Sequence, residues 1–235
     1  MTSMAGRSED VREQLVRIEG DFSPAALASS FGAEDMVLID LIAKDRFEIG
    51  VFTLDTGRLP RETLDLIETV RNRYAIAVEV FTPRSDAVAQ YVDHYGRDGF
   101  YESVEARKAC CGVRKVEPLR RALQGRKGWI TGLRREQSDS RGSVARVERD
   151  ETAGILKFNP LADWTNDDVW EYLRAHDVPY NALHDRGYPS IGCEPCTRAV
   201  KPGEHARAGR WWWEQDGAKK ECGLHVIPIR SEVRP

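Results

Sequence analysis

Five cysteines are the side chains of this 235-residue chain best suited to metal binding or nucleophilic chemistry. They form an adjacent pair, a pair separated by two residues, and a single residue near the C-terminus: Cys110 and Cys111, Cys193 and Cys196, and Cys222. A chain of this length does not need structural disulfides in a reducing compartment, so metal binding or catalysis explains the cysteines better. The odd total divides into four candidate ligands and one candidate nucleophile.

Cys222 is the candidate nucleophile. Lys219 and Lys220 precede it by three and two residues, and His225 follows it by three. A thiol attacks as its thiolate, and nearby cationic charge lowers the pKa of the thiol. Gly223 gives the segment freedom to move. The setting favours a mobile nucleophile, although a surface thiol in a frayed tail accounts for the same residues.

The other four cysteines have a spacing that favours an iron-sulfur cluster over zinc. The two-residue gap between Cys193 and Cys196 lets both thiolates reach one metal. Adjacent Cys110 and Cys111 would strain a single tetrahedral zinc, whereas a 4Fe-4S cube offers adjacent thiolates different iron atoms. A thiol-disulfide redox pair at 193 and 196 is a further alternative, but it leaves the adjacent pair unexplained.

Basic residues surround the adjacent pair. From Arg107 to Arg121 there are six basic residues against one acid, Glu117. Four thiolates on a 4Fe-4S core leave net negative charge, which Arg114 or Lys115 could offset while also facing a substrate anion. An exposed basic helix face is the alternative.

Apolar segments and helical patterns alternate as expected of an α/β protein. Strands are predicted over 25–29, 48–54, 77–81, 129–132 and 155–158, and helices over 9–19, 36–42, 61–73, 85–94 and about 165–175. The alternation predicts a doubly wound, mostly parallel sheet that binds ligands beyond the carboxyl ends of its strands. Residues 1–198 are expected to form this nucleotide-binding domain with the four candidate ligands, and 199–235 a catalytic tail that folds over the active site. The three tryptophans at 211–213 are expected to be packing anchors of the tail rather than a base-stacking platform.

Three segments end predicted strands and therefore fall on one rim of the sheet. They are the loop at 29–35, the turn at 54–57, and Gly132. A small-residue loop between a strand and a helix can point several backbone N–H groups at one anion. The loop at 29–35 has this setting, but it lacks the Walker lysine and the paired glycines of ATP pyrophosphatases. Because the three segments share the rim, a nucleotide site is favoured over three unrelated turns.

The polar loop after Gly132 contains Arg134, Arg135 and Arg141. Arginine forks suit the oxygens of phosphate or sulfate, so this loop is predicted to clamp an anion. A solvated surface loop is the alternative explanation for the same composition.

Overall charge excludes a general nucleic-acid or membrane-surface binder, since the net charge is -3 and the pI is about 6.0. The N-terminus lacks the apolar run of a signal peptide, and the longest apolar stretch, 36–43, is interrupted by Asp40. We therefore expect a soluble, cytoplasmic protein without membrane or nucleic-acid partners. A homo-oligomer is compatible with the sequence, which carries no signal for a particular number of copies.

Four motifs resemble the iron-sulfur class of assimilatory adenylyl-sulfate reductases within the PAPS/APS reductase family. They are Cys-Cys-Gly-Val-Arg-Lys at 110–115, Gly-Tyr-Pro-Ser-Ile-Gly-Cys-Glu-Pro-Cys-Thr at 187–197, Gly-Arg-Trp-Trp-Trp at 209–213 and Glu-Cys-Gly-Leu-His at 221–225. The cysteine pairs and the tail motif are highly specific, whereas the loop at 29–35 and the Leu-Asp-Thr-Gly turn are supportive. The resemblance implies an adenine nucleotide alpha hydrolase-like, Rossmann-like fold.

The resemblance also implies a reaction. Such enzymes reduce adenosine 5'-phosphosulfate (APS) to sulfite and AMP with electrons from thioredoxin, here expected to be a separate protein because only a short segment follows His225. Cys222 would attack the sulfate sulfur to form S-sulfocysteine, from which thioredoxin releases sulfite. Cys110, Cys111, Cys193 and Cys196 would ligate a 4Fe-4S cluster that does not donate the electrons.

Substrate contacts follow from the same resemblance. Lys115, Arg207, Arg210 and His225 match positions that contact the phosphosulfate, and Leu54 and Gly132 match backbone contacts to the nucleoside. With the rim loop and the arginine loop, the expected substrate contacts are Ser29, Ser30, Gly32, Asp35, Leu54, Lys115, Gly132, Arg134, Arg135, Arg207, Arg210 and His225.

Three other functions compete with this interpretation. The nearest is a reductase of 3'-phosphoadenosine 5'-phosphosulfate (PAPS), although relatives that use PAPS commonly lack the four cluster cysteines. A zinc-bearing nucleotide-binding protein without turnover is the second alternative. An ATP-pyrophosphatase-type enzyme is the third, and it is disfavoured because the rim loop lacks the glycine pair.

Overall fold

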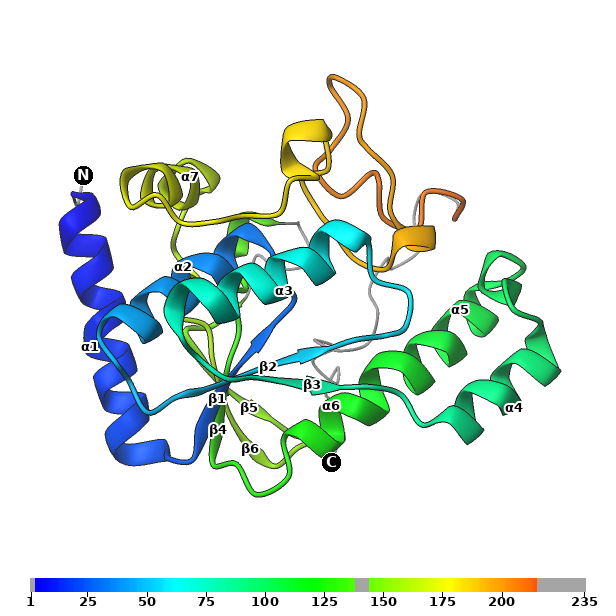
Figure 1. Ribbon diagram of the computed structural model, residues 1–235, viewed down its shortest axis with the longest axis horizontal. Helices are drawn as coiled ribbons and strands as arrows, with labels where there is room; N and C mark the ends of the chain where they lie inside the picture. Colours follow the sequence, from blue (N-terminus) through cyan, green and yellow to red (C-terminus); the bar gives the residue numbers. More distant parts are fainter. Residues whose placement is uncertain (1–2, 138–143, 215–235) are drawn as a thin grey trace, which may run out of the picture.

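The computed structural model describes residues 3–137 and 144–214. Within them a six-stranded sheet has the order β3-β2-β1-β4-β6-β5 (Figure 1). The strands are β1 (Ala25–Ser29), β2 (Gly50–Leu54), β3 (Val78–Phe81), β4 (Gly128–Ile130), β5 (Val147–Asp150) and β6 (Ile155–Phe158). All neighbouring pairs are parallel except β5 and β6. This topology confirms the predicted doubly wound, mostly parallel sheet.

Helices cover both faces of the sheet. Within the described residues they are α1 (Met4–Phe22), α2 (Ala33–Lys44), α3 (Arg61–Tyr74), α4 (Ser85–Tyr95), α5 (Val104–Cys111), α6 (Glu117–Ala122) and α7 (Asn166–Ala175). Leu27 and Val51 belong to the core shared with α1, α2, α3 and α7. Ala26 and Phe52, their neighbours in the strands, pack instead with Leu119 of α6. Because side chains alternate along a strand, β1 and β2 contribute to both layers.

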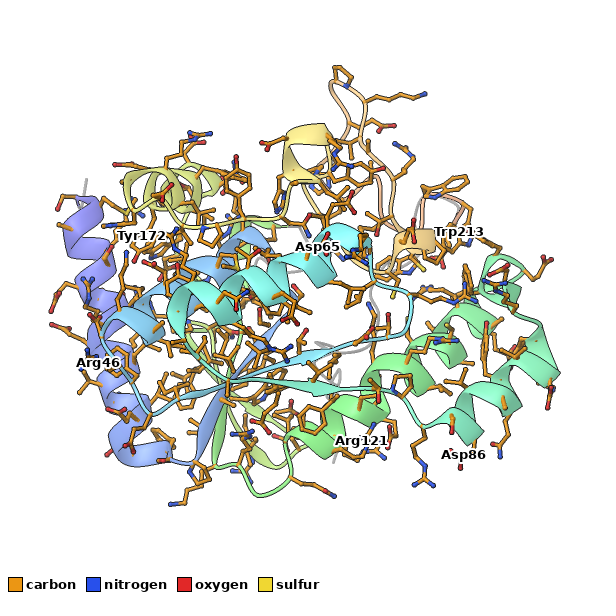
Figure 2. All side chains as sticks on the ribbon, viewed as in Figure 1. Arg46, Asp65, Asp86, Arg121, Tyr172 and Trp213 are labelled. Atoms are coloured by element: carbon orange, nitrogen blue, oxygen red, sulfur yellow. The ribbon has the colours of Figure 1, made fainter. Side chains whose placement is uncertain are left out.

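Buried polar contacts tie the first layer together. The Asp40 side chain of α2 is fully buried and accepts hydrogen bonds from Tyr74 of α3 (2.7 Å) and Tyr172 of α7 (2.8 Å; Figure 2). Lys44 pairs with the same carboxylate at 2.9 Å. Since a buried carboxylate is stable only when its oxygens are satisfied, these bonds fix α3 and α7 against α2.

Local signals explain most helix ends. Thr165 and Asp168 form the capping box that begins α7, as the sequence predicts. Arg84 is the N-cap of α4, because the backbone turns helical at Ser85, where the sequence predicts the helix to begin. Helix α1 is longer than the predicted 9–19, since the Ser3 hydroxyl accepts a hydrogen bond from the Gly6 amide and starts the helix earlier.

Two elements were not predicted. Strand β5 pairs antiparallel with β6 at the edge of the sheet, and its Val-Glu-Arg-Asp sequence has no apolar run to reveal it. A π-helical turn, η2 (Gly112–Val116), joins α5 to α6 directly after the adjacent cysteines. Such turns are frequent at functional sites, and this one contains Arg114 and Lys115. No helix in the described part of the chain is both long and apolar enough to cross a membrane.

Candidate active site

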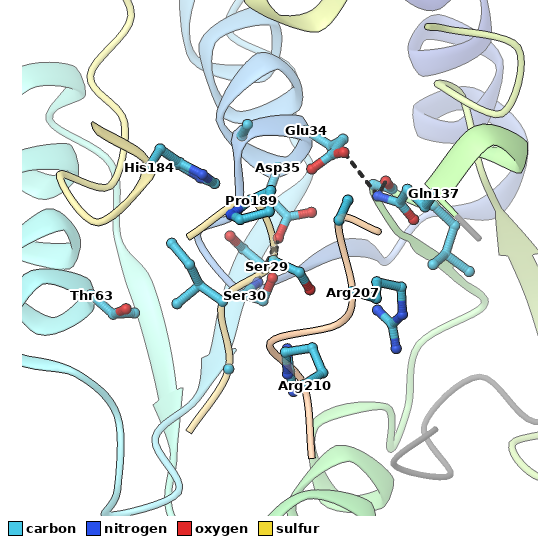
Figure 3. A pocket seen from close by; sticks show the side chains of 18 of the residues that line it. Ser29, Ser30, Glu34, Asp35, Thr63, Gln137, His184, Pro189, Arg207 and Arg210 are labelled. Carbon is cyan, nitrogen blue, oxygen red and sulfur yellow. Dashed lines mark hydrogen bonds between the residues drawn. The ribbon is translucent and has the colours of Figure 1, made fainter. Parts of the chain in front are cut away.

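A cavity of about 840 Å3 opens at the carboxyl ends of β1, β2 and β4 (Figure 3). This rim includes the point where strand order reverses, which is where doubly wound sheets bind ligands. Ten of the twelve predicted substrate contacts line it: Ser29, Ser30, Gly32, Asp35, Leu54, Lys115, Gly132, Arg134, Arg207 and Arg210. Of the other two, Arg135 is not among the lining residues and His225 lies outside the described residues.

The rim loop after β1 is held by the carboxylate of Asp35. Its Oδ2 accepts hydrogen bonds from the Ser30 amide (2.6 Å) and hydroxyl (2.9 Å). Burial raises the pKa of Asp35 to about 6, the Glu34 charge adds to this shift, and the Ser30 bonds oppose it. A β-carbon at Gly132 would collide with Asp35 Oδ1 and lie 2.9 Å from the β-carbon of Glu34. Only glycine at 132 therefore allows β4 to approach this loop.

Arg134 binds protein carboxylates rather than facing the cavity as a free cation. Its guanidinium is 2.8 Å from Glu34 and 3.0 Å from Glu136. Burial alone would raise the pKa of Glu34, but Arg134 and Gln137 lower it overall. Figure 3 shows the hydrogen bond between Gln137 and Glu34, which is 2.9 Å long.

The arginine loop therefore differs from the predicted anion clamp. Arg135 pairs with Asp163 and donates to the Val144 carbonyl at 2.8 Å, away from the cavity. Arg141 lies outside the described residues. The geometry gives Arg134 a positioning role in the rim and offers no support for Arg135 as a substrate contact.

Cationic side chains gather at the other end of the cavity, where Lys115, Arg207 and Arg210 line it. The Arg210 side chain is buried, and its guanidinium stacks on Trp211 with 4.8 Å from Cζ to the ring centroid. Its Nε is buried and has no hydrogen-bond partner among the described residues. A buried, incompletely satisfied guanidinium in an open cavity is suited to an anionic ligand.

A second, smaller cavity adjoins this cationic end and contains the four paired cysteines. Its lining includes Cys110, Cys111, Cys193 and Cys196. Lys115, Arg210 and Trp211 line both cavities, so the three side chains form a wall between the thiols and the nucleotide-sized space. The structure therefore brings together two cysteine pairs that are more than 80 residues apart in the sequence.

The thiols differ in environment. Burial favours the protonated form of Cys193, but Lys115 and Thr56 lower the pKa of this thiol overall, and Thr56 Oγ1 lies 3.3 Å from its sulfur. Burial, reinforced by Cys193, raises the pKa of Cys196 to about 12. Among the described residues, no group of three or more His, Cys, Asp or Glu side chains has the spacing to hold a metal ion.

The chain before residue 215 is tied to this region. The Trp211 amide donates to the Cys196 carbonyl at 3.1 Å, and the Trp211 side chain is buried as a packing anchor. Trp213 packs on Tyr101 with ring centroids 4.5 Å apart (Figure 2). Trp212 is 48% exposed, so the expected anchoring role is correct for its two neighbours and wrong for Trp212. Cys222 lies outside the described residues.

Several site residues carry no recognisable sequence signal. Arg107 of α5 and Glu214 form a buried ion pair at 2.6 Å that joins the cysteine helix to the last described residue. Thr56 lies in the turn at 54–57, which was predicted to border the nucleotide site, but no sequence pattern predicts its contact with Cys193. His184, which also lines the large cavity, stands in a segment where no pattern predicts a ligand contact.

A doubly wound sheet with this cavity at its rim defines a nucleotide-binding α/β protein. Residues 24–199 match the phosphoadenosine phosphosulfate reductase domain, and the chain belongs to that family.

Relatives that match over most of their length agree with this membership. The adenosine 5'-phosphosulfate reductase of Allochromatium vinosum is 55% identical over 223 residues, which cover 95% of this chain and 85% of the relative. The protein of the same name from Neisseria meningitidis serogroup A is 51% identical, and the match covers 95% of this chain and 92% of the relative.

Solved structures share the fold. The phosphoadenylyl-sulfate reductase of Candida auris, in a phosphate complex, is 26% identical with a TM-score of 0.68, over 85% of this chain and 98% of that chain. FMN adenylyltransferase of Candida glabrata, with 15% identity and a TM-score of 0.54 over 90% of this chain and 72% of that chain, shares the fold alone.

Proposed function

We propose that this protein reduces adenosine 5'-phosphosulfate to sulfite and AMP in the assimilation of sulfate. The observation that carries the proposal is the wall of Lys115 and Arg210 between a cavity of nucleotide size and four gathered thiols. The names of the Allochromatium and Neisseria relatives support APS as the substrate. We infer that the reaction takes place in the cytoplasm, where thiols are kept reduced.

The charge distribution in the cavity orients the nucleotide. Lys115, Arg207 and Arg210 attract the phosphosulfate to the end beside the cysteines. The nucleoside then lies toward the ends of β1 and β2, where Leu54 and Ser30 line the cavity. The phosphosulfate would then lie at the end of the cavity that Arg210 and Trp211 line, a few residues before the last described residue, Glu214.

The chemical step is a displacement at sulfur. The Cys222 thiolate attacks the sulfate sulfur, an S–S bond forms, and the S–O bond to the phosphate breaks. The electron pair of the broken bond leaves with AMP, whose oxygen gains negative charge. Lys115, Arg207 and Arg210 stabilise this developing charge, which lowers the barrier.

Reduction follows on the enzyme. A thiolate of thioredoxin attacks the Cys222 sulfur of S-sulfocysteine and expels sulfite, leaving a mixed disulfide. The second thioredoxin thiol resolves that disulfide and returns Cys222 to its thiol form. The dithiol of thioredoxin thus provides both electrons, and its disulfide is the oxidised product.

The four thiols do not converge on one metal ion, but a 4Fe-4S cube offers each thiolate a separate iron, so we propose that the smaller cavity holds such a cluster. Four cysteine side chains line it, Lys115 and Arg210 supply compensating charge, and Thr56 lies in contact with one ligand sulfur. Cys110, Cys111, Cys193 and Cys196 would hold the cluster. When bound, it would supply a fixed charge beside Lys115 that tunes this lysine without a change of oxidation state.

Labelled substrate tests the reaction directly. Wild-type protein incubated with 35S-APS in the absence of thioredoxin should carry the label on the peptide that contains Cys222. Cys222→Ser should bind AMP normally yet remain unlabelled. Label on the Cys222→Ser protein would contradict the proposed nucleophile.

Two further measurements separate the competing functions. Iron and acid-labile sulfide in stoichiometric amounts support the cluster, whereas zinc without sulfide supports a nucleotide-binding protein with no turnover. Rates with APS and PAPS must also be compared, because the name of the Candida auris structure concerns the 3'-phosphorylated nucleotide. A higher kcat/KM for PAPS would reassign the substrate.

A further inference from the structure

His184 presents an unusual feature in the wall of the large cavity. It begins the short helical turn η5 (His184–Arg186), and both nitrogens of its ring are buried without a hydrogen-bond partner among the described residues. In Figure 3 the ring points from this turn into the cavity. Buried polar atoms are almost always paired in folded proteins, so two orphaned nitrogens beside an open cavity indicate a missing ligand.

Aromatic neighbours hold the ring in place. The His184 ring packs edge-on against Trp170, with centroids 5.2 Å apart and an interplanar angle of 86°, and lies 6.5 Å from the ring of Tyr180. Burial lowers the pKa of His184, although the Glu34 charge, the nearby backbone of Tyr188 and the Asp185 charge oppose the shift. The Tyr188 backbone does not reach hydrogen-bond geometry with either ring nitrogen, so both stay available to a ligand. A neutral imidazole offers one hydrogen-bond donor and one acceptor in a fixed orientation.

The surroundings show which part of a ligand this ring would meet. Lys115, Arg207 and Arg210 supply positive charge at one end of the cavity, whereas the charge that acts most strongly on His184 is the negative charge of Glu34. In Figure 3 Pro189 and Ser30 lie between His184 and Arg210. An anionic group is favoured at the arginine end, so the His184 end suits an uncharged group that both donates and accepts hydrogen bonds.

We propose that His184 hydrogen-bonds the nucleoside of the bound nucleotide and thereby helps to select it. This inference rests on the proposed function, because it takes the ligand to be an adenosine phosphosulfate. A purine edge or a ribose hydroxyl has the required donor and acceptor character, whereas the phosphate and sulfate do not. A site that hydrogen-bonds its ligand rejects analogues that leave buried polar groups unpaired.

The decisive variant is His184→Phe, which keeps a ring against Trp170 but removes both nitrogens. Loss of two unsatisfied polar atoms should leave the thermal unfolding temperature unchanged or raise it. The Kd for AMP, measured by calorimetry on the cluster-loaded protein, should rise about tenfold. A purely structural histidine would give the opposite pattern, with lower stability and unchanged affinity.

Amide variants and a matched histidine provide the controls. His184→Asn and His184→Gln place an amide near the positions of Nδ1 and Nε2, and one of them should recover part of the AMP affinity. His176 is exposed at the end of α7 and does not line the cavity, so His176→Phe should bind AMP as wild type does. The amide variants also decide the matter should His184→Phe fail to fold.

Ligand analogues identify the contacted group. If His184 meets the base, His184→Phe should lose less affinity for IMP than for AMP; if it meets the ribose, the smaller loss should be for 2'-deoxy-AMP. Equal AMP affinity of wild type, His184→Phe and both amide variants would overturn the inference while leaving the proposed function intact. Failure of the wild type to bind AMP would overturn both.

Discussion

Gly192 lies directly against the guanidinium of Arg210. A β-carbon at residue 192 would stand 2.5 Å from Cζ and 2.7 Å from Nη1 of Arg210, distances that atoms in van der Waals contact do not reach. The cation that lines both cavities is thus seated by the absence of a side chain in the segment just before Cys193.

Gly192→Ala should therefore impair the reaction by displacing Arg210. The backbone at 192 has no positive φ, so alanine is tolerated locally and the change in unfolding free energy should be small. A guanidinium moved by about 1 Å can cost up to about a hundredfold in rate, so kcat/KM for APS should fall by about 10- to 100-fold. Steady-state kinetics measure this effect.

Gly20→Ala is the matched control, because no atom lies within 4 Å of a β-carbon at that position in α1. It should leave kcat/KM unchanged and stabilise the protein by about 0.5–1 kcal/mol through helix propensity. Wild-type kcat/KM in Gly192→Ala would show that Arg210 can move without consequence.

Asp35 should make stability depend on pH in a predictable direction. Its pKa is raised from 3.8 to about 6, so the folded protein binds this proton more tightly than the unfolded chain does. Ionisation of Asp35 therefore lowers the free energy of unfolding. This loss is absent below about pH 4, grows as pH rises to about 6, and then stays constant at about 3 kcal/mol. Asp35→Asn, which cannot ionise, should therefore gain stability over wild type as pH rises through this window.

Urea unfolding of both proteins at pH 4.5 and pH 7.5 measures that gain. Subtracting the unfolding free energy of wild type from that of Asp35→Asn at each pH cancels the contribution of other titrating groups. The result should be larger at pH 7.5 than at pH 4.5. A difference independent of pH would mean that Asp35 is not protonated more readily in the folded state.

The layered fold could be predicted because its information is local. Ala26 and Leu27 are adjacent residues that pack on opposite faces of β1, and a short apolar run between turn residues predicts such a strand. The edge strand β5 could not be predicted in this way. Its pairing with β6 depends on main-chain hydrogen bonds, while its own Glu148 and Arg149 are polar.

The candidate site was predictable where its residues end strands, as Ser29 and Leu54 do. Pairings over long sequence distances were not. Arg134 looked like a free anion ligand because its partner Glu34 lies 100 residues earlier in the chain. The orphaned nitrogens of His184 are likewise a property of packing that no sequence pattern encodes.

Cluster assembly should depend on Cys196 and not on Cys222. Cys196→Ala removes one of four thiols that line the smaller cavity, so bound iron, acid-labile sulfide and most of the activity should be lost. The unfolding temperature should fall as well, since a group bound only by the folded state stabilises it.

Cys222→Ser is the matched control for that variant, because Cys222 is the one cysteine that is not a proposed cluster ligand, and it lies outside the described residues. It should retain wild-type iron and unfolding temperature while losing turnover. An iron-free Cys196→Ala protein with full activity would refute a necessary cluster.

The buried pair of Arg107 and Glu214 should respond asymmetrically to substitution. Their side chains are 1% and 3% exposed and 2.6 Å apart, and Arg107 also stacks on Trp211. Glu214→Leu alone leaves a buried charge without its partner and should cost about 3–5 kcal/mol of unfolding free energy. The double variant Arg107→Met/Glu214→Leu should recover most of this loss, because it removes both buried charges.

An exposed ion pair in α3 provides the control, because the side chains of Arg61 and Asp65 are 82% and 58% exposed. The double variant Arg61→Met/Asp65→Leu and its two single variants should each change the free energy of unfolding by less than about 1 kcal/mol. Urea denaturation of wild type, these five variants and the single variant Arg107→Met completes both cycles. A Glu214→Leu protein as stable as wild type would show that this pair does not hold the cysteine helix to the chain before residue 215.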